Sequence, residues 1–292
     1  MHTFVMTGAT GGIGRIAAEH LLTQPDLHLV ILARDPATVD PRATAIHADL
    51  RSLTSIRTAA ERITALLDSG DLPPLQGFAG NAGIQLTNAT TTGEDGYEAT
   101  FTVNVLADHL LLRLLEKRFT APARIVLTGS DTHFGDLGHN LGLIPAPVWQ
   151  DPAILARPAA FRRPASTAAG RTAYSTSKLA VQYLVHEWAR RLPAGVDIVS
   201  YNPGFVPGTG LARNAGAFER LVARRALPAL ARTPLATDMT TAGAQLAAVL
   251  LGRVTAPTGG YIDRDREATS SPESYDEQRE RQLFAALEEF LA

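Results

Sequence analysis

The sequence predicts an α/β fold in which parallel strands form one sheet covered by helices on both faces. Short apolar runs alternate along the chain with longer segments whose apolar residues recur every three or four positions. The run 27–33 is apolar at nearly every position, which is typical of a parallel strand buried on both faces. No internal repeat or linker divides the chain, so we expect one domain over residues 1–292.

The remaining elements follow from the same patterns. The expected strands are 3–7, 27–33, 44–47, 75–79, 123–127, 196–201 and 260–263. Helices are expected after Gly14, over 52–67, 94–119 and 237–251, and through Tyr174. The segment 94–119 carries Asn104 near its middle. Because asparagine is a mediocre residue inside a helix, we expect a functional reason for its presence.

The tail, residues 276–291, is predicted to form an amphipathic helix. Its apolar residues fall on one stripe, made of Leu283, Phe284, Leu287, Phe290 and Leu291. Packing on the core of the same chain is the usual use of such a stripe, and docking to a partner is the alternative.

The composition is that of an ordinary globular protein and excludes several classes of function. Of 292 residues, 45% are hydrophobic and 19% are charged, and the net charge of −2 gives no case for binding nucleic acid. Cysteine is absent, which excludes disulfides, thiol catalysis and cysteine-bound metals and fits a cytoplasmic location. The eight histidines show no metal-ligand spacing, so no metal is expected. We expect neither a signal peptide nor a membrane span, which needs ~20 apolar residues.

A glycine-rich turn follows the first strand and opens the first helix. Glycines let the backbone approach a pyrophosphate, and the N–H groups at the start of the helix stabilise its charge, so this context indicates a dinucleotide site. A tight turn without a ligand is the alternative. The candidate cofactor residues in this turn are Gly8, Thr10, Gly11, Gly12, Ile13 and Gly14.

The end of the second strand indicates which dinucleotide binds. An acidic residue there would suit the ribose 2′-OH of NAD, whereas Arg34 suits the 2′-phosphate of NADP. We therefore expect NADP(H) as the preferred cofactor, with NAD(H) possible because Asp35 follows. Two solvated charges are the alternative. Asp49 and Leu50 end the third strand and are expected to border the adenine.

Tyr174 and Lys178 stand four residues apart, and therefore on one face of the predicted helix. A lysine ammonium beside a phenol favours the phenolate and lowers the tyrosine pKa, which suits a general acid/base. The alternative is a helix with one buried tyrosine and one surface lysine.

Together, the motifs of this chain resemble those of the short-chain dehydrogenase/reductase family in order and spacing, from about Thr3 to Tyr261. The matching residues are Gly8, Gly12, Gly14, Asn81, Ala82, Gly83, Asn104, Ser130, Tyr174, Lys178, Pro203 and Gly204. The long interval between Ser130 and Tyr174 is similar to that of the retinol dehydrogenase and protochlorophyllide reductase branch. The resemblance implies a single-domain Rossmann fold with a doubly wound parallel sheet of about seven strands.

The resemblance also implies roles for single residues. Tyr174 would be the general acid/base, Lys178 would lower its pKa and hold the cofactor ribose, and Ser130 would bind the substrate oxygen. Asn104 would fix a water in a proton relay. Further cofactor contacts are implied for Asn81, Ala82, Gly83, Pro203, Gly204, Val206 and Thr209.

Two segments depart from the family pattern. An insertion at about 131–171 is rich in proline and contains aromatic residues, which favours a lid or substrate wall over a disordered loop. A second segment, 205–236, is expected to cover the nicotinamide and the substrate. The candidate substrate residues are Ser130, His133, Phe134, Trp149 and Phe205.

The expected function is NADPH-dependent reduction of a ketone or aldehyde of a bulky hydrophobic small molecule, or the reverse reaction, in secondary metabolism. The alternatives are a non-catalytic NADP-binding sensor or scaffold, and a C=C reductase or epimerase on the same fold. The protein is expected to be a monomer or a homodimer.

Overall fold

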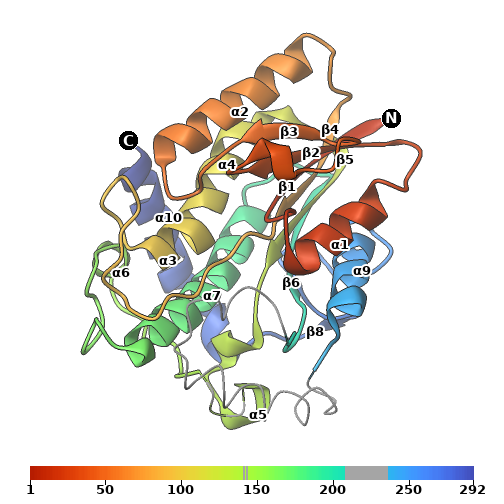
Figure 1. The fold of residues 1–292 in the computed structure, drawn as a ribbon. Helices are drawn as coiled ribbons and strands as arrows, with labels where there is room; N and C mark the ends of the chain where they lie inside the picture. The colour runs from red at the N-terminus through yellow and green to blue at the C-terminus, as the bar shows by residue number, and fades with distance from the viewer. Residues whose placement is uncertain (141, 143, 208–235) are drawn as a thin grey trace.

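The computed structural model describes residues 1–140, 142, 144–207 and 236–292 and has one sheet at its centre (Figure 1). Among these residues, eight strands pair in the order β3-β2-β1-β4-β5-β6-β7-β8. Their bounds are β1 His2–Thr7, β2 Leu27–Ala33, β3 Thr44–His47, β4 Leu75–Gly80, β5 Phe119–Thr128, β6 Val196–Asn202, β7 Tyr261–Asp263 and β8 Arg266–Ala268. The strand order reverses between β1 and β4, so the sheet is doubly wound, and ligands of such sheets bind at the carboxyl ends of the strands at that point.

Neighbouring strands pair in parallel, except for β7 and β8, which form an antiparallel hairpin. The predicted α/β fold is confirmed. The sequence pattern does not predict β8, because three residues of which two are charged give no apolar strand signal.

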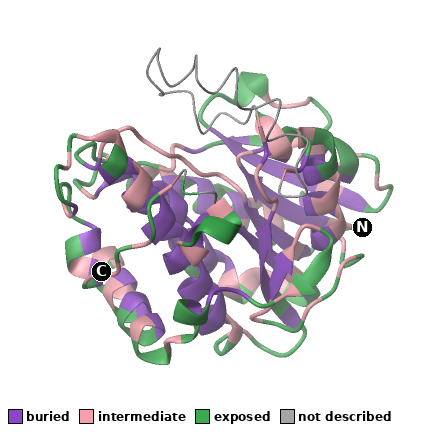
Figure 2. Ribbon diagram, turned by 90° about the horizontal axis from the view of Figure 1, so that it is seen from below, coloured by how far each residue is buried: buried purple, intermediate pink, exposed green. Residues whose placement is uncertain are grey.

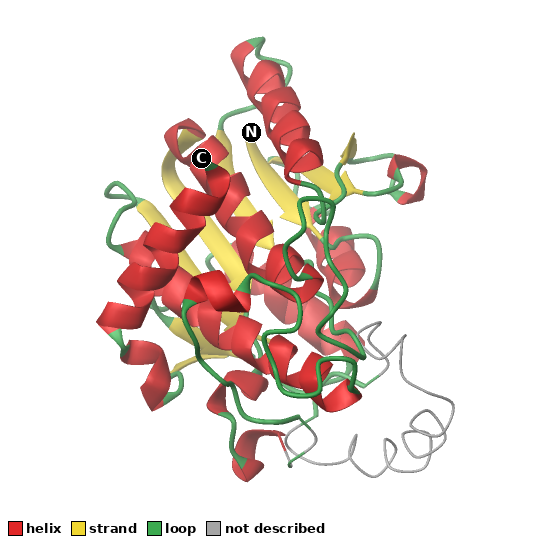
Figure 3. Cartoon of the chain, turned by 90° about the vertical axis from the view of Figure 1, so that its left-hand side faces the viewer, coloured by secondary structure: helices red, strands yellow, loops and turns green. Residues whose placement is uncertain are grey.

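Helices cover both faces of the sheet (Figure 1). α1 (Gly12–Leu21) and α9 (Met239–Leu250) lie side by side on one face. α2 (Leu53–Asp68), α4 (Ala107–Leu115) and α7 (Thr167–Ala189) cover the other, and Figure 3 looks onto this second layer with the strands behind it. The remaining helical turns are short: Pro36–Thr38, α3 Ala99–Phe101, Thr102–Leu106, Glu116–Arg118, Asp131–Phe134, α5 Leu137–Asn140, α6 Pro152–Leu155 and Pro272–Tyr275.

Every residue of α7 from Ala173 to Trp188 is buried, although a surface helix normally exposes one face. Figure 2 shows the buried residues gathered in the sheet and on the helices that pack against it. The tail helix, α10 (Glu277–Leu291), packs on α7 and buries Leu283 and Leu287 completely. The apolar stripe of the tail therefore lies on the core of the same chain.

The predicted long helix over 94–119 is shorter than expected. Gly93 and Gly96 precede it, and Gly96 adopts a positive φ of 83°, so the helical turns begin only at Ala99. Glu98 caps this start, because its carboxylate accepts a hydrogen bond from Phe101 N at 2.7 Å. At the other end, β5 begins at Phe119, four residues before the predicted strand.

No helix within the described part of the chain is long and apolar enough to cross a membrane. The same residues hold no group of three or more His, Asp or Glu side chains that could bind a metal ion.

Candidate active site

The turn after β1 is tightly packed on its inner side and open on its outer side. A Cβ added to Gly14 would lie 2.1 Å from the carbonyl oxygen of Gly8, so only glycine fits there. A Cβ added to Gly11 or Gly12 would meet no atom within 4 Å. α1 begins here without a side-chain cap, so its first N–H groups have no side-chain acceptor. Thr10 is exposed and Ile13 half-buried beside them.

Hydrogen bonds tie together the carboxyl ends of β1, β4 and β5. Thr7 Oγ1 accepts from the backbone N–H groups of Asn81 and Ala82, both at 3.1 Å. Asn81 Nδ2 donates to Gly8 O at 3.1 Å, and Asn81 Oδ1 accepts from Thr128 Oγ1 at 3.3 Å. We call Thr7, Asn81, Ala82 and Thr128 the site floor. The sequence patterns do not single out Thr7 or Thr128, because their partners lie more than 40 residues away.

The chain after β2 and β3 forms the outer end of the predicted cofactor site. Arg34 is exposed there. The Asp35 carboxylate accepts a hydrogen bond from Ala37 N, two residues along the chain, at 3.1 Å. Asp49 pairs with Arg51 at 3.1 Å. Burial raises the pKa of Asp49, but the hydrogen bonds from Arg51 and the charge of Arg34 outweigh burial and lower it. Leu50 is half-buried beside this pair.

Asn104 lies in a π-helical turn, Thr102–Leu106, between α3 and α4. Its Oδ1 accepts from Ile84 N at 2.8 Å, and its Nδ2 donates to Ile84 O at 3.1 Å and to Ser177 Oγ at 2.9 Å. π-helical turns inside α-helices often occur at functional sites. Asn104 thus joins the loop after β4 to α7, which supplies the reason for an asparagine within a helix.

Ser130, Tyr174 and Lys178 meet above the floor. The Ser130 side chain lies close enough to the Tyr174 phenol to lower its pKa. Lys178 Nζ donates to Thr128 O at 2.7 Å and lies 5.8 Å from the centre of the Tyr174 ring. Thr132 donates to Ser130 Oγ from its backbone N at 3.3 Å and from its hydroxyl at 3.1 Å. The four predicted catalytic residues are therefore brought together.

Burial dominates the electrostatics of this group. It raises the pKa of Tyr174 to about 12, a shift that the nearby Asp131 carboxyl increases and the Ser130 hydrogen bond reduces. Burial also lowers the pKa of Lys178 to about 8. The expectation that Lys178 lowers the pKa of Tyr174 below its ordinary value is wrong for the protein alone, because the loss of water around the phenol has the larger effect.

The turn after β6 adopts a conformation that requires glycine. Gly204 has a φ of +72°, and a Cβ there would lie 2.8 Å from the Arg264 guanidinium. Its N–H donates to Asn202 Oδ1 at 3.1 Å, and Pro203, just before it, is half-buried. Phe205 forms an isolated parallel β-bridge with Ala236.

Most of the predicted covering segment, including Thr209, lies outside the described residues. Val206 is described and is 8% exposed.

His133 is buried and both of its ring nitrogens are engaged. Its Nε2 accepts from Ser271 N at 3.1 Å, so Nδ1 carries the proton and donates to Ser130 O at 2.5 Å. Burial lowers the pKa of His133 to about 4 and keeps the ring neutral. These contacts favour a role in holding Ser130 in place, and contact of His133 with substrate stays a prediction.

Two of the aromatic residues predicted to contact substrate, Phe134 and Trp149, pack against different parts of the chain. Phe134 is half-buried and stacks on His139 with ring centres 3.7 Å apart. Trp149 packs edge-on against Tyr183 at 4.7 Å. Tyr183 follows Tyr174 by nine residues, which is two and a half helical turns and so the opposite side of α7. This geometry argues against contact between Trp149 and a substrate at Tyr174.

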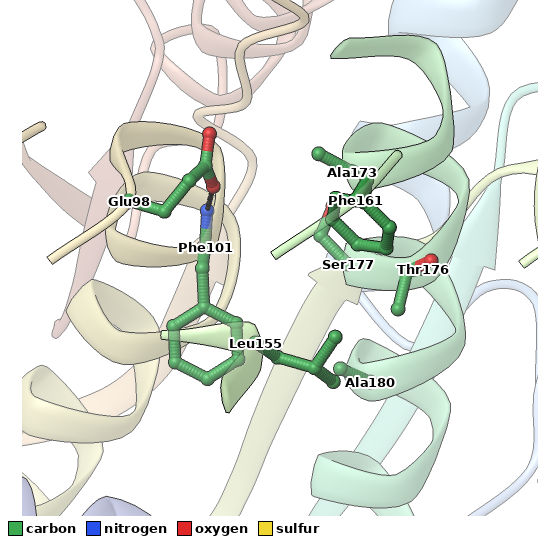
Figure 4. A pocket seen from close by; sticks show the side chains of 8 residues that line it. All are labelled: Glu98, Phe101, Leu155, Phe161, Ala173, Thr176, Ser177 and Ala180. Atoms are coloured by element: carbon green, nitrogen blue, oxygen red, sulfur yellow. Dashed lines mark hydrogen bonds between the residues drawn. The ribbon is translucent and has the colours of Figure 1, made fainter. Parts of the chain in front are cut away.

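A cavity of about 10 Å³ lies where α3, α6 and α7 meet, in part lined by the insertion (Figure 4). Its lining residues are Glu98, Phe101, Leu155, Phe161, Ala173, Thr176, Ser177 and Ala180. The volume suits at most one water, so this cavity is not a substrate site. Leu155 and Phe161 belong to the core cluster, so this half of the insertion packs as core and not as a lid.

Comparison with known proteins decides the family. The family model described as short chain dehydrogenase matches residues 2–138. Retinol dehydrogenase 13 of Mus musculus is 30% identical over 308 residues, which cover 97% of this chain and 81% of that protein. The chain belongs to the short-chain dehydrogenase/reductase family.

Other members of this oxidoreductase family support the assignment. The protein named as daunorubicin C-13 ketoreductase DnrU of Streptomyces sp. (strain C5) is 35% identical over 215 residues, covering 70% of this chain and 66% of DnrU. Among solved structures, NADPH-bound carbonyl reductase from chicken fatty liver has a TM-score of 0.59 at 17% identity, covering 92% of this chain and 98% of that one. That similarity concerns the fold alone.

Proposed function

We propose that this protein is an NADPH-dependent oxidoreductase that reduces a ketone or aldehyde of a bulky hydrophobic molecule to an alcohol, or catalyses the reverse reaction. The observation that carries the proposal is the arrangement at the ends of β4 and β5. There the buried Tyr174 phenol lies close to the Ser130 hydroxyl, beside a buried lysine and the hydrogen bonds of Asn104. A phenol, a hydroxyl and an ammonium placed together supply a proton donor, an oxygen-binding group and a charge that supports both.

The residues on the cofactor side fit a dinucleotide. The open side of the turn at Gly11 and Gly12, with the uncapped start of α1, suits a pyrophosphate, and the exposed Arg34 suits a 2′-phosphate. Asp49, Leu50 and the residues 81–83 would border the adenosine and ribose, and Pro203, Gly204, Val206 and Thr209 the nicotinamide. Solved structures of the same fold were determined with NADPH, NADP or NADH, so use of NAD(H) stays part of the proposal. Bound there, the nicotinamide supplies the hydride.

The side chains of the protein supply the proton that the carbonyl oxygen takes up. At neutral pH the Tyr174 phenol is protonated, since its pKa is about 12, so it can donate to the carbonyl oxygen as charge builds on that oxygen. Ser130 Oγ, fixed by Thr132, donates a hydrogen bond that strengthens in the transition state. Lys178 stabilises the phenolate left on Tyr174 and holds the ribose. Asn104 orders the loop and helix around them.

The names of relatives support a bulky hydrophobic substrate. They include dehydrogenases or reductases named for daunorubicin, retinol, polyprenol and protochlorophyllide. Phe134 and Phe205, half-buried near Ser130 and Gly204, are the side chains that we propose to contact it. A cytoplasmic location, a role in secondary metabolism and the choice between monomer and homodimer stay predictions.

The test is oxidation of NADPH, followed by its absorbance, with a panel of bulky ketones and aldehydes. We expect activity with NADPH that falls by about 10²–10⁴-fold or more in Tyr174→Phe. Tyr183→Phe is the matched control, because it removes the same hydroxyl from the opposite side of α7. Binding of NADPH without reduction of any carbonyl would favour the sensor or scaffold function, and reduction of a C=C bond would be visible in the product.

A further inference from the structure

Asp108 is a buried carboxyl group that the proposed mechanism does not use. It is 2% exposed and lies in the first turn of α4, four residues after Asn104. Its Oδ1 has no hydrogen-bond partner among the described residues. A buried carboxylate oxygen without a partner is costly to maintain, so its place calls for an explanation.

The carboxylate lies over the end of β4, where only glycine leaves room for it. A Cβ added to Gly80, the last residue of β4, would lie 2.6 Å from each of its two oxygens. Gly80 pairs with Leu127 in the neighbouring strand, β5. The carboxylate therefore faces the same edge of the sheet as the proposed active site.

Lys178 reaches this edge from α7. Its Nζ donates to the carbonyl of Thr128, the residue that follows Leu127. A Cβ added to Gly83, three residues after Gly80, would lie 3.6 Å from Nζ and 3.5 Å from Asn104 Oδ1. Asn104, Asp108 and Lys178 thus converge on the ends of two adjacent strands.

The charges of Asp108 and Lys178 act on each other. Burial lowers the pKa of Lys178 to about 8, and the carboxylate opposes that change. Burial raises the pKa of Asp108 to about 7, and the ammonium opposes that change. Within the described residues, each is the charged group that shifts the other, while Asp131 acts on Tyr174.

We propose that Asp108 is a positioning residue that keeps the ammonium of the buried Lys178 charged where the proton transfer takes place. The inference rests on the proposed function, because that function requires a charged Lys178. Asp108 would join Asn104, Ser130, Tyr174 and Lys178 as a fifth residue of the site. Without the carboxylate, burial acts unopposed and Lys178 loses its proton at a lower pH. The phenolate formed on Tyr174 then loses its stabilising charge.

Lys178 can be observed directly, because the sequence contains only two lysines, Lys117 and Lys178. Protein made with ¹³C-labelled lysine gives two Cε NMR signals that titrate separately, and Lys117→Arg assigns them. In Asp108→Asn, which keeps the shape and removes the charge, we expect Lys178 to titrate lower by about one pH unit or more. The signal of the exposed Lys117 serves as the internal reference. An unchanged titration of Lys178 would overturn the proposal.

Glu98→Gln is the matched control. Glu98 is also buried, also has an oxygen without a partner among the described residues, and lies ten residues earlier, but it faces the small cavity of Figure 4. The substitution Glu98→Gln should leave the Lys178 titration unchanged. If Asp108→Asn does not fold, Gly80→Ala provides a second route, since its Cβ displaces the carboxylate and should shift the titration in the same direction.

The consequence for catalysis is a change in pH dependence. Since the charged form of Lys178 is the active one, a lower pKa moves the alkaline limb of kcat/KM to lower pH in Asp108→Asn, and not in Glu98→Gln. A shifted titration with an unmoved alkaline limb would overturn the positioning role. Absence of reductase activity in the unmodified protein would instead overturn the proposed function, while the NMR comparison would still decide whether Asp108 sets the charge of Lys178.

Discussion

The site floor and the insertion at 131–171 lie close to the same tyrosine but differ in how much ring packing adds to their hydrogen bonds. The floor consists of strand ends cross-linked by directional hydrogen bonds, such as those from Asn81 and Ala82 to Thr7. The insertion is held by backbone hydrogen bonds, such as that from Ala159 N to Ala89 O at 2.7 Å, and in addition by packing between rings, such as Phe134 on His139 and Trp149 on Tyr183. Directional bonds fix atoms for chemistry, whereas ring packing fills space and tolerates change. We infer that the floor sets the reaction and that the insertion sets stability and shape.

The largest effect beyond Tyr174 itself should come from breaking the floor. Thr7→Val keeps the shape of the side chain but leaves two N–H groups without their acceptor. We expect a loss of about 3 kcal/mol in the free energy of unfolding, measured with denaturant, together with weaker NADPH binding. Thr58→Val, which removes an exposed hydroxyl from α2, is the control. Equal effects from the two variants would show that the floor is not held in this way.

The insertion is tested by Trp149→Ala. Because Trp149 packs on the far side of α7, we expect a loss of about 2 kcal/mol in the free energy of unfolding with KM for the carbonyl substrate unchanged. The sequence alone predicts the opposite, a raised KM, and that result would place Trp149 in the substrate site.

His133 lies in the insertion and is hydrogen-bonded to Ser130, and its pKa predicts a dependence of stability on pH. Its folded pKa of about 4 lies below the ordinary value of 6.5, so the unfolded chain takes up a proton first as the pH falls. Stability is therefore complete above about pH 6.5 and is lost toward pH 4. Between pH 7 and pH 5 the loss should be about 2 kcal/mol for this histidine. His109, with a folded pKa of about 3, contributes in the same direction, so the unfolding free energies of His133→Gln and the unmodified protein must be compared at both pH values.

The smallest effect concerns the outer end of the cofactor site. Arg34→Ala should raise KM for NADPH about tenfold and leave KM for NADH unchanged, since a charge-assisted contact to the 2′-phosphate is lost. Equal changes in KM for NADPH and NADH would mean that Arg34 does not contact the 2′-phosphate.

Much of this site could be predicted from sequence because its signals are local. Each of three signals depends on a few neighbouring residues. They are the spacing of Tyr174 and Lys178, the glycines after β1, and Asn104 as an unusual residue inside a predicted helix. Thr7 and Asp108 could not be found in this way, because their importance depends on strands and helices that meet only in the fold. The apolar pattern predicts a helix start at Glu94, whereas the structure begins it at Ala99, because the positive φ of Gly96 and the cap formed by Glu98 outweigh that pattern. The side of α7 on which Trp149 packs could not be predicted either, because it depends on tertiary contact with Tyr183.

The burial of Lys178 also has a practical side. With 4% of its surface exposed, it is shielded from amine-reactive reagents, whereas Lys117 is exposed just before β5 begins. The start of β5 lies at the opposite edge of the sheet from Thr128 and the proposed active site. A resin that couples to lysine side chains would therefore attach through Lys117, with the catalytic edge turned toward the solution.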